Sequence, residues 1–560
     1  MLTEAFEESL AELRFDALPS LRRTRPKFVD DGKKFESRCR LLRNTSVATG
    51  RGVRHDPKRL LCRLLPGAVL FQHVRFEGNQ LKGSFVCMLA WCQRLRMKIA
   101  NLAILFAGCA LAQSTRVDWE KQKPEVLEHF RDLIRIDTSS PPGNETKAVD
   151  YLRKTLEDNG IGTQTFSLNP NRANLVARLK GNGSKRPLLI LAHTDVVPVH
   201  REKWPLDPFG AILKDGYVWG RGSTDDKPIL TALLMTMLEL KRTGAALDRD
   251  VIFLAESGEE ADPTGVGINF MVAQHFKEIE AEFAVTEGGG AVIENGRVVA
   301  VNIGTAEKLP ARVRLVVNGT SGHGSVPRED NALIHLGGAV EKVGTWRTPM
   351  RLSDTTRTYF EKLAQMSPPE KAARYNALLN PATAEEAQNY LAKNDPRRYS
   401  MLRTSVVPTM LKAGVGPNVI PSQAEATLDI RALPDENIPA FYEQMKRVIG
   451  DPAVKIEPIP MTRPPSPASR LDTEMYKTLE RVAKEMYPGT TVLPTMSTGA
   501  SDMAQLRAKG IPSYGIGPAA TENDSTNFGA HSDVERLPES SLYPLVEYAW
   551  RTVSEVAVRR

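Results

Sequence analysis

Three short apolar runs, at residues 187–193, 251–255 and 283–285, most strongly constrain how this chain can fold. Each run is bounded by polar residues, a pattern typical of strands buried on both faces of a mainly parallel sheet. An apolar helical segment at residues 229–240 lies between the first two runs. Because strand and helix signals alternate in this way, the sequence predicts an α/β fold with a mainly parallel sheet.

Each predicted strand leads directly into side chains that can bind a metal ion. His193 ends the first strand and Asp195 follows it, Glu259 and Glu260 follow the second, and Glu287 follows the third. Open α/β sheets place their sites beyond the carboxyl ends of strands. A lone histidine is more often structural and adjacent glutamates are usually solvated, so each motif is weak by itself. At the ends of buried strands, however, they indicate a metal site with one glutamate free to move a proton.

Two further motifs add possible ligands. Asp225 and Asp226 end a glycine-punctuated turn at residues 217–227, and His531 lies in a loop at residues 528–535. The aspartate pair has an alternative interpretation, as an acidic first turn that complements the dipole of the next helix. Together the motifs supply two imidazoles and several carboxylates, which suit Zn²⁺, with Co²⁺ or Mn²⁺ as alternatives. All five cysteines precede residue 110, so the later part of the chain offers no thiolate ligand.

The ordered motifs resemble those of metallopeptidase family twenty. They are H-x-D-V-V-P, G-R-G-x-x-D-D-K, E-E, E-G-G, G-H-G-S and a late histidine, over residues 117–560. That family includes aminoacylases, acetylornithine and succinyl-diaminopimelate deacylases, carnosinases, and carboxypeptidases of the G and S types. The resemblance implies a di-zinc catalytic domain in two parts, residues 113–305 and 459–560. It also implies an inserted α+β lid and dimerisation domain at residues 306–458, through which two copies would form a homodimer.

The resemblance assigns a role to each ligand candidate. Two groups of three residues would each hold one metal ion and share a bridging aspartate: His193, Asp225 and Glu287 in the first, and Asp225, Glu260 and His531 in the second. Asp195 would orient His193, and Glu259 would be the general base. The peptide bond between Asp225 and Asp226 is expected to be cis.

These roles imply metal-assisted hydrolysis of an amide bond. Two divalent cations would share a water with a lowered pKa, and Glu259 would take its proton and return it to the departing amine. We expect a small peptide or an N-acyl amino acid as the substrate. An exopeptidase, dipeptidase or carboxypeptidase and an N-acyl amino acid deacylase both stay open. The inserted lid disfavours the related lidless aminopeptidase type. The complete ligand set disfavours a non-catalytic binding protein.

The predicted lid carries three further candidates. His323, in a Gly-His-Gly-Ser loop, resembles the family histidine that stabilises the oxyanion, often across the dimer, although the loop alone would be interpreted as a turn. Asn418 and Arg431 resemble substrate contacts. The Arg431 guanidinium could hold a substrate carboxylate, and its alternative role is a structural ion pair with Asp429. The chain departs from the family pattern at Pro228, at residues 261–264 and in a long stretch at 349–400.

The segment that begins at Met97 resembles a secretory signal peptide, with a basic start, a short apolar run and an Ala-x-Ala site that ends at Ala112. We therefore expect residues 97–112 to be a signal peptide and the mature protein to be periplasmic or extracellular, without a transmembrane span. A buried helix and a lipid anchor at Cys109 are the alternatives. Signal peptides occupy N-termini, so residues 1–96 are expected to be a misassigned upstream leader or a disordered extension.

The positive charge of the chain belongs to that leader. The formal net charge is +7, but residues 1–96 hold 19 Lys and Arg against 10 Asp and Glu, which leaves 55 against 57 for the rest. A nucleic-acid-binding domain would carry its own basic excess. We therefore expect no nucleic-acid partner.

Overall fold

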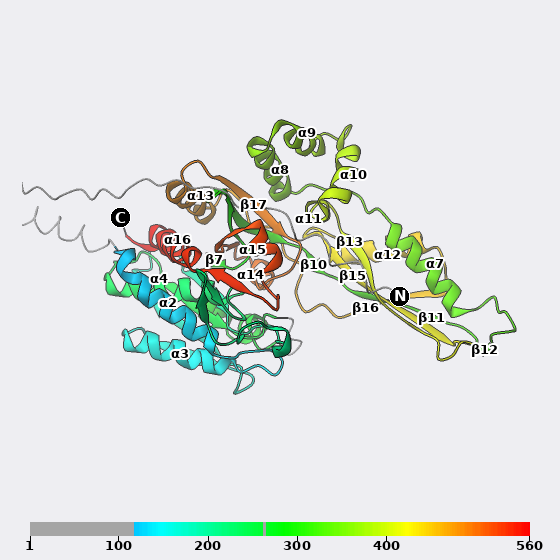
Figure 1. Ribbon diagram of the computed structural model, residues 1–560, viewed down its shortest axis with the longest axis horizontal. Coiled ribbons are helices and arrows are strands. Elements are labelled where there is room, and N and C mark those ends of the chain that lie inside the picture. The colour runs from blue at the N-terminus through cyan, green and yellow to red at the C-terminus, as the bar shows by residue number, and fades with distance from the viewer. Residues whose placement is uncertain (1–116, 261–264, 560) are drawn as a thin grey trace, which may run out of the picture. The chain divides into compact units, whose positions relative to one another are not determined.

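The computed structural model describes residues 117–260 and 265–559 (Figure 1). The predictions for the leader 1–96, the signal peptide 97–112, Cys109 and the departure at 261–264 lie outside the described residues. Among the helices that are described, none combines the length and apolar character that a membrane span requires.

A ten-stranded mixed sheet forms the predicted catalytic part of the chain. Its order is β1-β2-β6-β3-β7-β18-β9-β8-β19, and β17 pairs with β9. Its strands are β1 (Thr163–Phe166), β2 (Asn174–Leu179), β3 (Leu188–His193), β6 (Val251–Glu256), β7 (Phe283–Thr286), β8 (Gly290–Glu294), β9 (Arg297–Glu307), β17 (Thr491–Ser497), β18 (Ser513–Gly515) and β19 (Ala519–Thr521). The four neighbours β6, β3, β7 and β18 are parallel, which confirms the predicted α/β class with a mainly parallel sheet at its centre.

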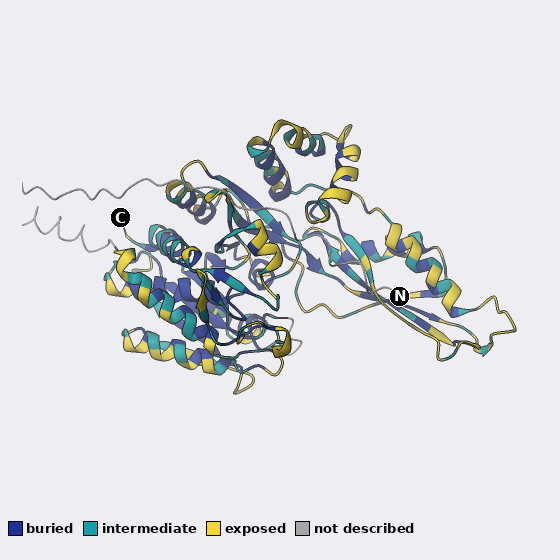
Figure 2. Ribbon diagram, viewed as in Figure 1, coloured by how far each residue is buried: buried dark blue, intermediate teal, exposed yellow. Residues whose placement is uncertain are grey.

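Alternate residues of β3 pack into two different buried clusters, which is why the strand is apolar up to its last residue, His193. Leu188 and Ile190 pack into one buried cluster, with the helices α2 (Trp119–Arg135), α3 (Glu145–Asp158), α4 (Lys227–Arg242), α13 (Glu474–Met486) and α16 (Glu539–Ala557). Leu189 and Leu191 pack into another, with α5 (Ile268–Gln274), α6 (Phe276–Ile279) and α14 (Met503–Ala508). Both faces of the strand are therefore covered, and Figure 2 shows the inner strands of the sheet mostly in the colour of buried residues.

A small three-stranded sheet brings two distant loops together. It has the order β20-β5-β4, formed by β20 (Arg536–Pro538), β5 (Tyr217–Trp219) and β4 (Ile212–Lys214). The loop after β5 carries the aspartate pair, and the loop between α15 (Glu522–Asn527) and β20 carries His531. A short 3₁₀ helix, η2 (Arg201–Lys203), precedes this sheet in the chain.

The predicted lid contains a separate antiparallel sheet. Its strands are β10 (Leu309–Pro310), β11 (Val313–Asn318), β13 (Ser405–Ala413), β15 (Gln423–Ala432) and β16 (Val454–Pro458). The alternating apolar residues of β11 face two amphipathic helices, α7 (Ala332–Thr345) and α12 (Ile438–Ile449). Two short strands, β12 (Gly322–His323) and β14 (Val419–Ile420), pair apart from that sheet.

The long stretch at residues 349–400 forms four helices: α8 (Asp354–Met366), α9 (Pro369–Leu378), α10 (Ala384–Asn394) and α11 (Pro396–Ser400). Phe360 and Leu363 of α8 share a buried cluster with Leu493 and Met496 of β17. In addition, Lys362 Nζ donates to Glu480 and to the carbonyl of Val492. This stretch, which the sequence assigns to the lid range, therefore packs on the ten-stranded sheet.

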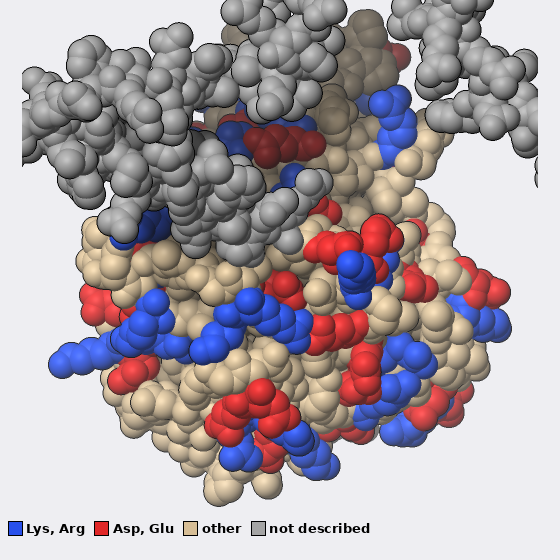
Figure 3. All heavy atoms as spheres, turned by 90° about the vertical axis from the view of Figure 1, so that its left-hand side faces the viewer, with Lys and Arg blue, Asp and Glu red and all other residues tan. Residues whose placement is uncertain are grey.

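Charged side chains of both signs are interspersed on the face shown in Figure 3. Surface ion pairs such as Arg153–Asp150 and Lys154–Asp158 of α3 likewise join charges of opposite sign. The interspersed charges agree with the near balance of acidic and basic residues after residue 96.

Candidate metal centre

Three neighbouring parallel strands end at the same edge of the catalytic sheet. His193 is the last residue of β3, Glu256 is its partner at the end of β6, and Glu287 follows β7 directly. The carboxyl ends of parallel strands form the edge at which α/β proteins place their sites. The sheet therefore holds one histidine and two glutamates close together at this edge.

Two groups of three side chains lie at this edge, and Asp225 belongs to both. His193, Asp225 and Glu287 form one group, and Asp225, Glu260 and His531 form the other, with the ligand atoms of each group within 4.8 Å of one another. The two carboxylate oxygens of Asp225 point to different histidines: Oδ1 lies 3.0 Å from His193 Nε2, and Oδ2 lies 3.4 Å from His531 Nε2. This geometry suits a carboxylate that bridges two cations.

The peptide bond between Asp225 and Asp226 is cis, as expected from the sequence. His531 has a positive φ of 65°, uncommon for a residue other than glycine, and its Nε2 lies 3.0 Å from Glu260 Oε1. Its side chain is 53% exposed, whereas that of His193 is 1% exposed. The second group is therefore the one open to solvent.

Glu535 fixes the two loops that bring Asp225 and His531 together. Its buried carboxylate accepts hydrogen bonds from Arg221 Nη1 at 2.6 Å, the Gly222 amide at 3.1 Å and the Thr224 amide at 2.7 Å. Glu535 ends the motif that contains His531, and the sequence alone did not indicate this role. The available signal in the sequence was an acidic residue in the same motif as a metal-ligand candidate.

Asp195 connects the end of β3 to the glutamate pair. The Nδ1 atom of His193 lies 3.0 Å from the main-chain oxygen of Asp195 and 3.5 Å from its carboxylate. The same carboxylate accepts hydrogen bonds from the main-chain amides of Glu259 and Glu260, both at 3.1 Å. One buried side chain therefore lies beside the ring of His193 and also holds the turn that presents both glutamates.

Glu259 is buried next to this turn and forms an ion pair that the sequence did not indicate. Its carboxylate contacts the guanidinium of Arg463, whose Nη2 also donates to the Glu259 carbonyl at 3.2 Å. Burial raises the pKa of Glu259 to about 8. Arg463 lies in the proline-rich connection that follows β16, where no motif identifies it.

The electrostatics of the site fit a pair of divalent cations. Burial raises the pKa of Glu287 well above its ordinary value, and the charges of Asp225 and Glu259 raise it further. Burial alone would raise the pKa of Asp225, but hydrogen bonds from His193 and His531 lower it. Hydrogen bonds to Asp225 and Glu260 raise the pKa of His531 to about 10. Bound cations would relieve the repulsion among these carboxylates, and the imidazole and carboxylate donors suit Zn²⁺.

The three candidates in the lid do not join this cluster. His323 is exposed and contacts Ser325, and Asn418 lies beside it because its carbonyl accepts a hydrogen bond from the Gly324 amide at 2.7 Å. Arg431 donates to Asp429 at 2.9 Å, which is the structural ion pair given above as the alternative. Within the described part of one chain, none of the three side chains hydrogen-bonds to or ion-pairs with a metal-ligand candidate. Their roles stay predictions.

An α/β domain with two such ligand groups beside the carboxyl ends of its central strands has the arrangement of a metal-dependent hydrolase. The chain belongs to Peptidase family M20/M25/M40, whose sequence profile matches residues 189–555. Its members are metallopeptidases and aminoacylases, so this chain is a hydrolase of peptide or N-acyl amino acid amide bonds. The family resemblance described above is thereby confirmed.

Several curated relatives are similar over much of the chain. The human N-fatty-acyl-amino acid synthase/hydrolase PM20D1 is 31% identical over 330 residues, 57% of this chain and 64% of that protein, so the match spans less than two thirds of that relative. Human aminoacylase-1 is 27% identical over 444 residues, 78% of this chain and 96% of that protein. A probable carboxypeptidase S-like 2 of Dictyostelium discoideum is also 27% identical, over 78% of this chain and 80% of that protein.

Solved structures share the fold at lower identity. The metallo-carboxypeptidase Sso-CP2 of Sulfolobus solfataricus matches with a TM-score of 0.56 and 20% identity, over 77% of this chain and 98% of that chain. The YXEP protein of Bacillus subtilis, described as a dinuclear metal-binding peptidase, matches with a TM-score of 0.52 and 17% identity, over 78% of this chain and 99% of that one. Both similarities support the fold of the catalytic part and the lid.

Proposed function

We propose that this chain is an exported, two-metal hydrolase that releases an amino acid with a free α-carboxylate from an acyl group or from a short peptide. The observation that carries the proposal is Asp225, which is shared between two ligand groups, one of which contains Glu260, the residue after Glu259. The names of three relatives support this substrate class: the human N-fatty-acyl-amino acid synthase/hydrolase, human aminoacylase-1, and the carboxypeptidase S-like protein of Dictyostelium discoideum.

The ligand groups would hold two divalent cations, and Zn²⁺ is our proposal because the donors are imidazole and carboxylate. When bound, the two cations supply a Lewis acid for the substrate carbonyl and lower the pKa of water. Glu259 holds the proton that leaves the attacking water and gives it to the departing amine. Asp195 keeps Glu259 and Glu260 in place through their main-chain amides.

We also propose that two copies pair through their lids. The lid strand β13 pairs on one side with β15, and its Val407, Met410 and Leu411 are exposed. Exposed apolar residues on an unpaired strand edge favour association with a second chain. In such a homodimer the partner subunit's His323 would stabilise the oxyanion, which agrees with the absence of a contact between His323 and the metal-ligand candidates of its own described chain.

A substrate panel combined with one conservative variant tests the proposed function. Purified enzyme with added zinc, cobalt or manganese should release free amino acid from N-acyl amino acids or from dipeptides, and a chelator should abolish this activity. Glu259→Gln should lower kcat by at least 10²-fold while the enzyme retains two metal ions per chain. The exposed Glu522→Gln variant serves as the control and should keep full activity.

Three results would contradict the proposal. They are a wild-type enzyme without chelator-sensitive amide hydrolysis, a wild-type enzyme without stoichiometric metal, and full activity of the Glu259→Gln variant. The first two would instead favour a binding protein on this fold. Export is tested separately, since N-terminal sequencing of the natural protein should find a start just after residue 112, and peptides from residues 1–96 would contradict it.

A further inference from the structure

We propose that Arg463 is a positioning residue for Glu259 and that the linker returning from the lid carries it to the site. The inference rests on the proposed function, in which Glu259 moves the proton. Arg463 holds Glu259 at two points, because its Nη2 contacts the Glu259 carboxylate and donates to the Glu259 main-chain oxygen at 3.2 Å. Its Nη1 faces Asp502, with an N to O distance of 3.8 Å.

The ion pair between Arg463 and Glu259 is buried, which strengthens it relative to an ion pair on the surface. The side chains of Arg463 and Glu259 are 12% and 9% exposed, and Asp502 is also buried. An ion pair in such a site is screened far less than a surface pair, and removal of one partner leaves the other charge uncompensated. The guanidinium is planar with donors in a fixed arrangement, so it restricts the rotamer of Glu259 more tightly than a flexible ammonium would.

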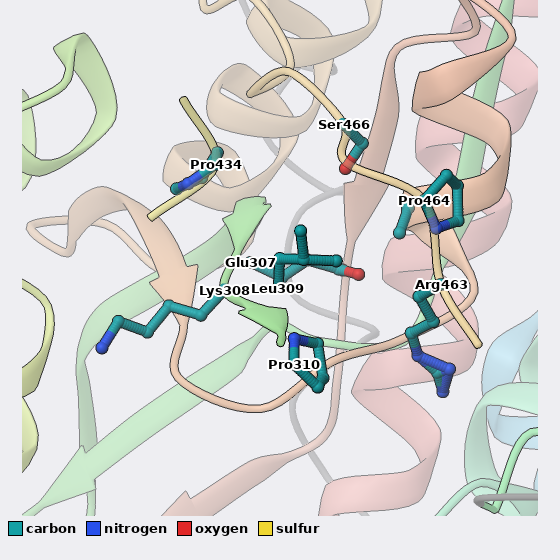
Figure 4. A pocket seen from close by; sticks show the side chains of 9 residues that line it. Glu307, Lys308, Leu309, Pro310, Pro434, Arg463, Pro464 and Ser466 are labelled. Carbon is teal, nitrogen blue, oxygen red and sulfur yellow. The ribbon is translucent and has the colours of Figure 1, made fainter. Parts of the chain in front are cut away.

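The position of Arg463 in the chain connects the base to the lid. Arg463 follows the last lid strand, β16, by five residues and is flanked by Pro464. Both residues line a pocket with Glu307, Leu309 and Pro310, the segment through which the chain enters the lid (Figure 4). The segment that enters the lid and the segment that returns from it therefore line the same pocket. The returning segment brings the guanidinium of Arg463 into contact with the carboxylate of Glu259.

A general base acts only when its carboxylate lies within hydrogen-bond reach of the proton that it takes. A displacement of about 1 Å can lower a rate by about 10²-fold. Among the described residues, Arg463 forms no hydrogen bond or ion pair with the five metal-ligand candidates, so it acts on the reaction through Glu259. Loss of Arg463 should therefore lower kcat and leave metal binding nearly unchanged.

The test compares variants of the full chain on an N-acyl amino acid that the wild type hydrolyses. Arg463→Met keeps most of the volume but removes the charge, and it should lower kcat by about 10- to 100-fold with KM and metal content changed less than about threefold. Arg463→Lys should recover part of kcat. Arg470→Met is the matched control, because Arg470 is exposed in the same region and pairs only with Asp472 among the described contacts.

Two further measurements separate a positioning role from other roles. In a Glu259→Gln background, Arg463→Met should cause little additional loss of kcat, because the group that it positions is already absent. Guanidine added to an Arg463→Ala variant should restore part of the activity. The unfolding midpoints of the two single variants and the double variant, measured on metal-free protein, should be non-additive, since the residues are in direct contact.

Each alternative outcome overturns the inference. Unchanged kcat in Arg463→Met and Arg463→Lys would show that Glu259 needs no such support. A large rise in KM with kcat unchanged would make Arg463 a substrate-binding residue, and full additivity with Glu259→Gln would make it independent of the base. In all three cases the proposed function stands if Glu259→Gln remains inactive, whereas a wild-type chain without amide hydrolysis would refute the proposed function itself.

Discussion

Glu535→Gln should loosen the two loops that carry Asp225 and His531. The carboxylate of Glu535 is fully buried and accepts hydrogen bonds from the Arg221 guanidinium, two main-chain amides and the Thr224 hydroxyl. Glutamine fills the same volume, but it removes the charge and turns an N–H donor toward groups that also donate. Breaking a buried ion pair by removing one partner costs about 3–5 kcal/mol.

Amide hydrogen exchange of the metal-free protein measures this cost locally. The Gly222 and Thr224 amides donate to Glu535, so their protection depends on the contact. A loss of about 3–5 kcal/mol corresponds to exchange that is about 2 × 10²- to 5 × 10³-fold faster if these amides exchange through opening of the loop. Because the loops carry metal-ligand candidates, zinc affinity should also fall by about 10- to 100-fold.

A surface pair of the same type provides the control. Arg481 Nη1 lies 2.6 Å from Glu485 Oε1, the same distance as in the Arg221–Glu535 pair, but the two side chains are 43% and 51% exposed. Glu485→Gln should change stability by less than about 1 kcal/mol, as for exposed ion pairs in general. The reasoning is refuted if Glu535→Gln leaves loop exchange and zinc affinity as little changed as Glu485→Gln does.

Three further predictions concern the orienting carboxylate, the lid surface and a histidine pair. Asp195→Asn can accept only one of the two amide hydrogen bonds, so zinc affinity should fall by about 10- to 100-fold in an equilibrium titration, and unchanged affinity would exclude a supporting role. Leu411→Asp places a charge on the exposed β13 edge and should convert dimers to monomers in sedimentation velocity, whereas a dimer that persists would place the interface elsewhere. A hydrogen bond to Asp451 raises the pKa of His335 in the folded protein. The protonated His335 therefore contributes fully to stability below the pKa of histidine in the unfolded chain, about 6.5, and this contribution is lost as the pH rises through the pKa of His335 in the folded protein. The difference in unfolding midpoint between wild type and His335→Gln should therefore be larger at pH 6 than at pH 9, and an equal difference at both would contradict the assignment.

The sequence indicated where the metal-ligand candidates would gather because several of them follow strands with a clear signature. His193 and Glu287 each end or follow a run that is buried on both faces, and the carboxyl ends of neighbouring parallel strands must meet at one edge. The residues carried by loops, Asp225 and His531, could be placed only through the order of motifs, since no local pattern shows that β5 and β20 pair.

Other features could not be predicted because they depend on contacts between distant segments. Arg463 lies in an irregular, proline-rich connection, where the sequence indicates an extended chain but not the direction of a side chain. For Arg463 the sequence indicated no partner, whereas for Arg431 it indicated two. The spacing of Arg431 from Asp429 allowed both a structural ion pair and a contact with the substrate. The structure shows the pair, at 2.9 Å, within the isolated chain.

The packing of the helices in residues 349–400 also depends on contacts between distant segments, which the sequence does not reveal. The amphipathic pattern of α8 predicts an apolar face but does not say what covers it. In the structure, Phe360 of α8 shares one buried cluster with Leu493 of the catalytic sheet and with Leu433, which follows the lid strand β15. A single apolar cluster therefore joins the catalytic sheet, the inserted helices and the base of the lid. Any movement that separates these parts must expose that apolar surface, at about 25 cal/mol per Å², so the inserted helices oppose separation of the lid base from the sheet edge at β17.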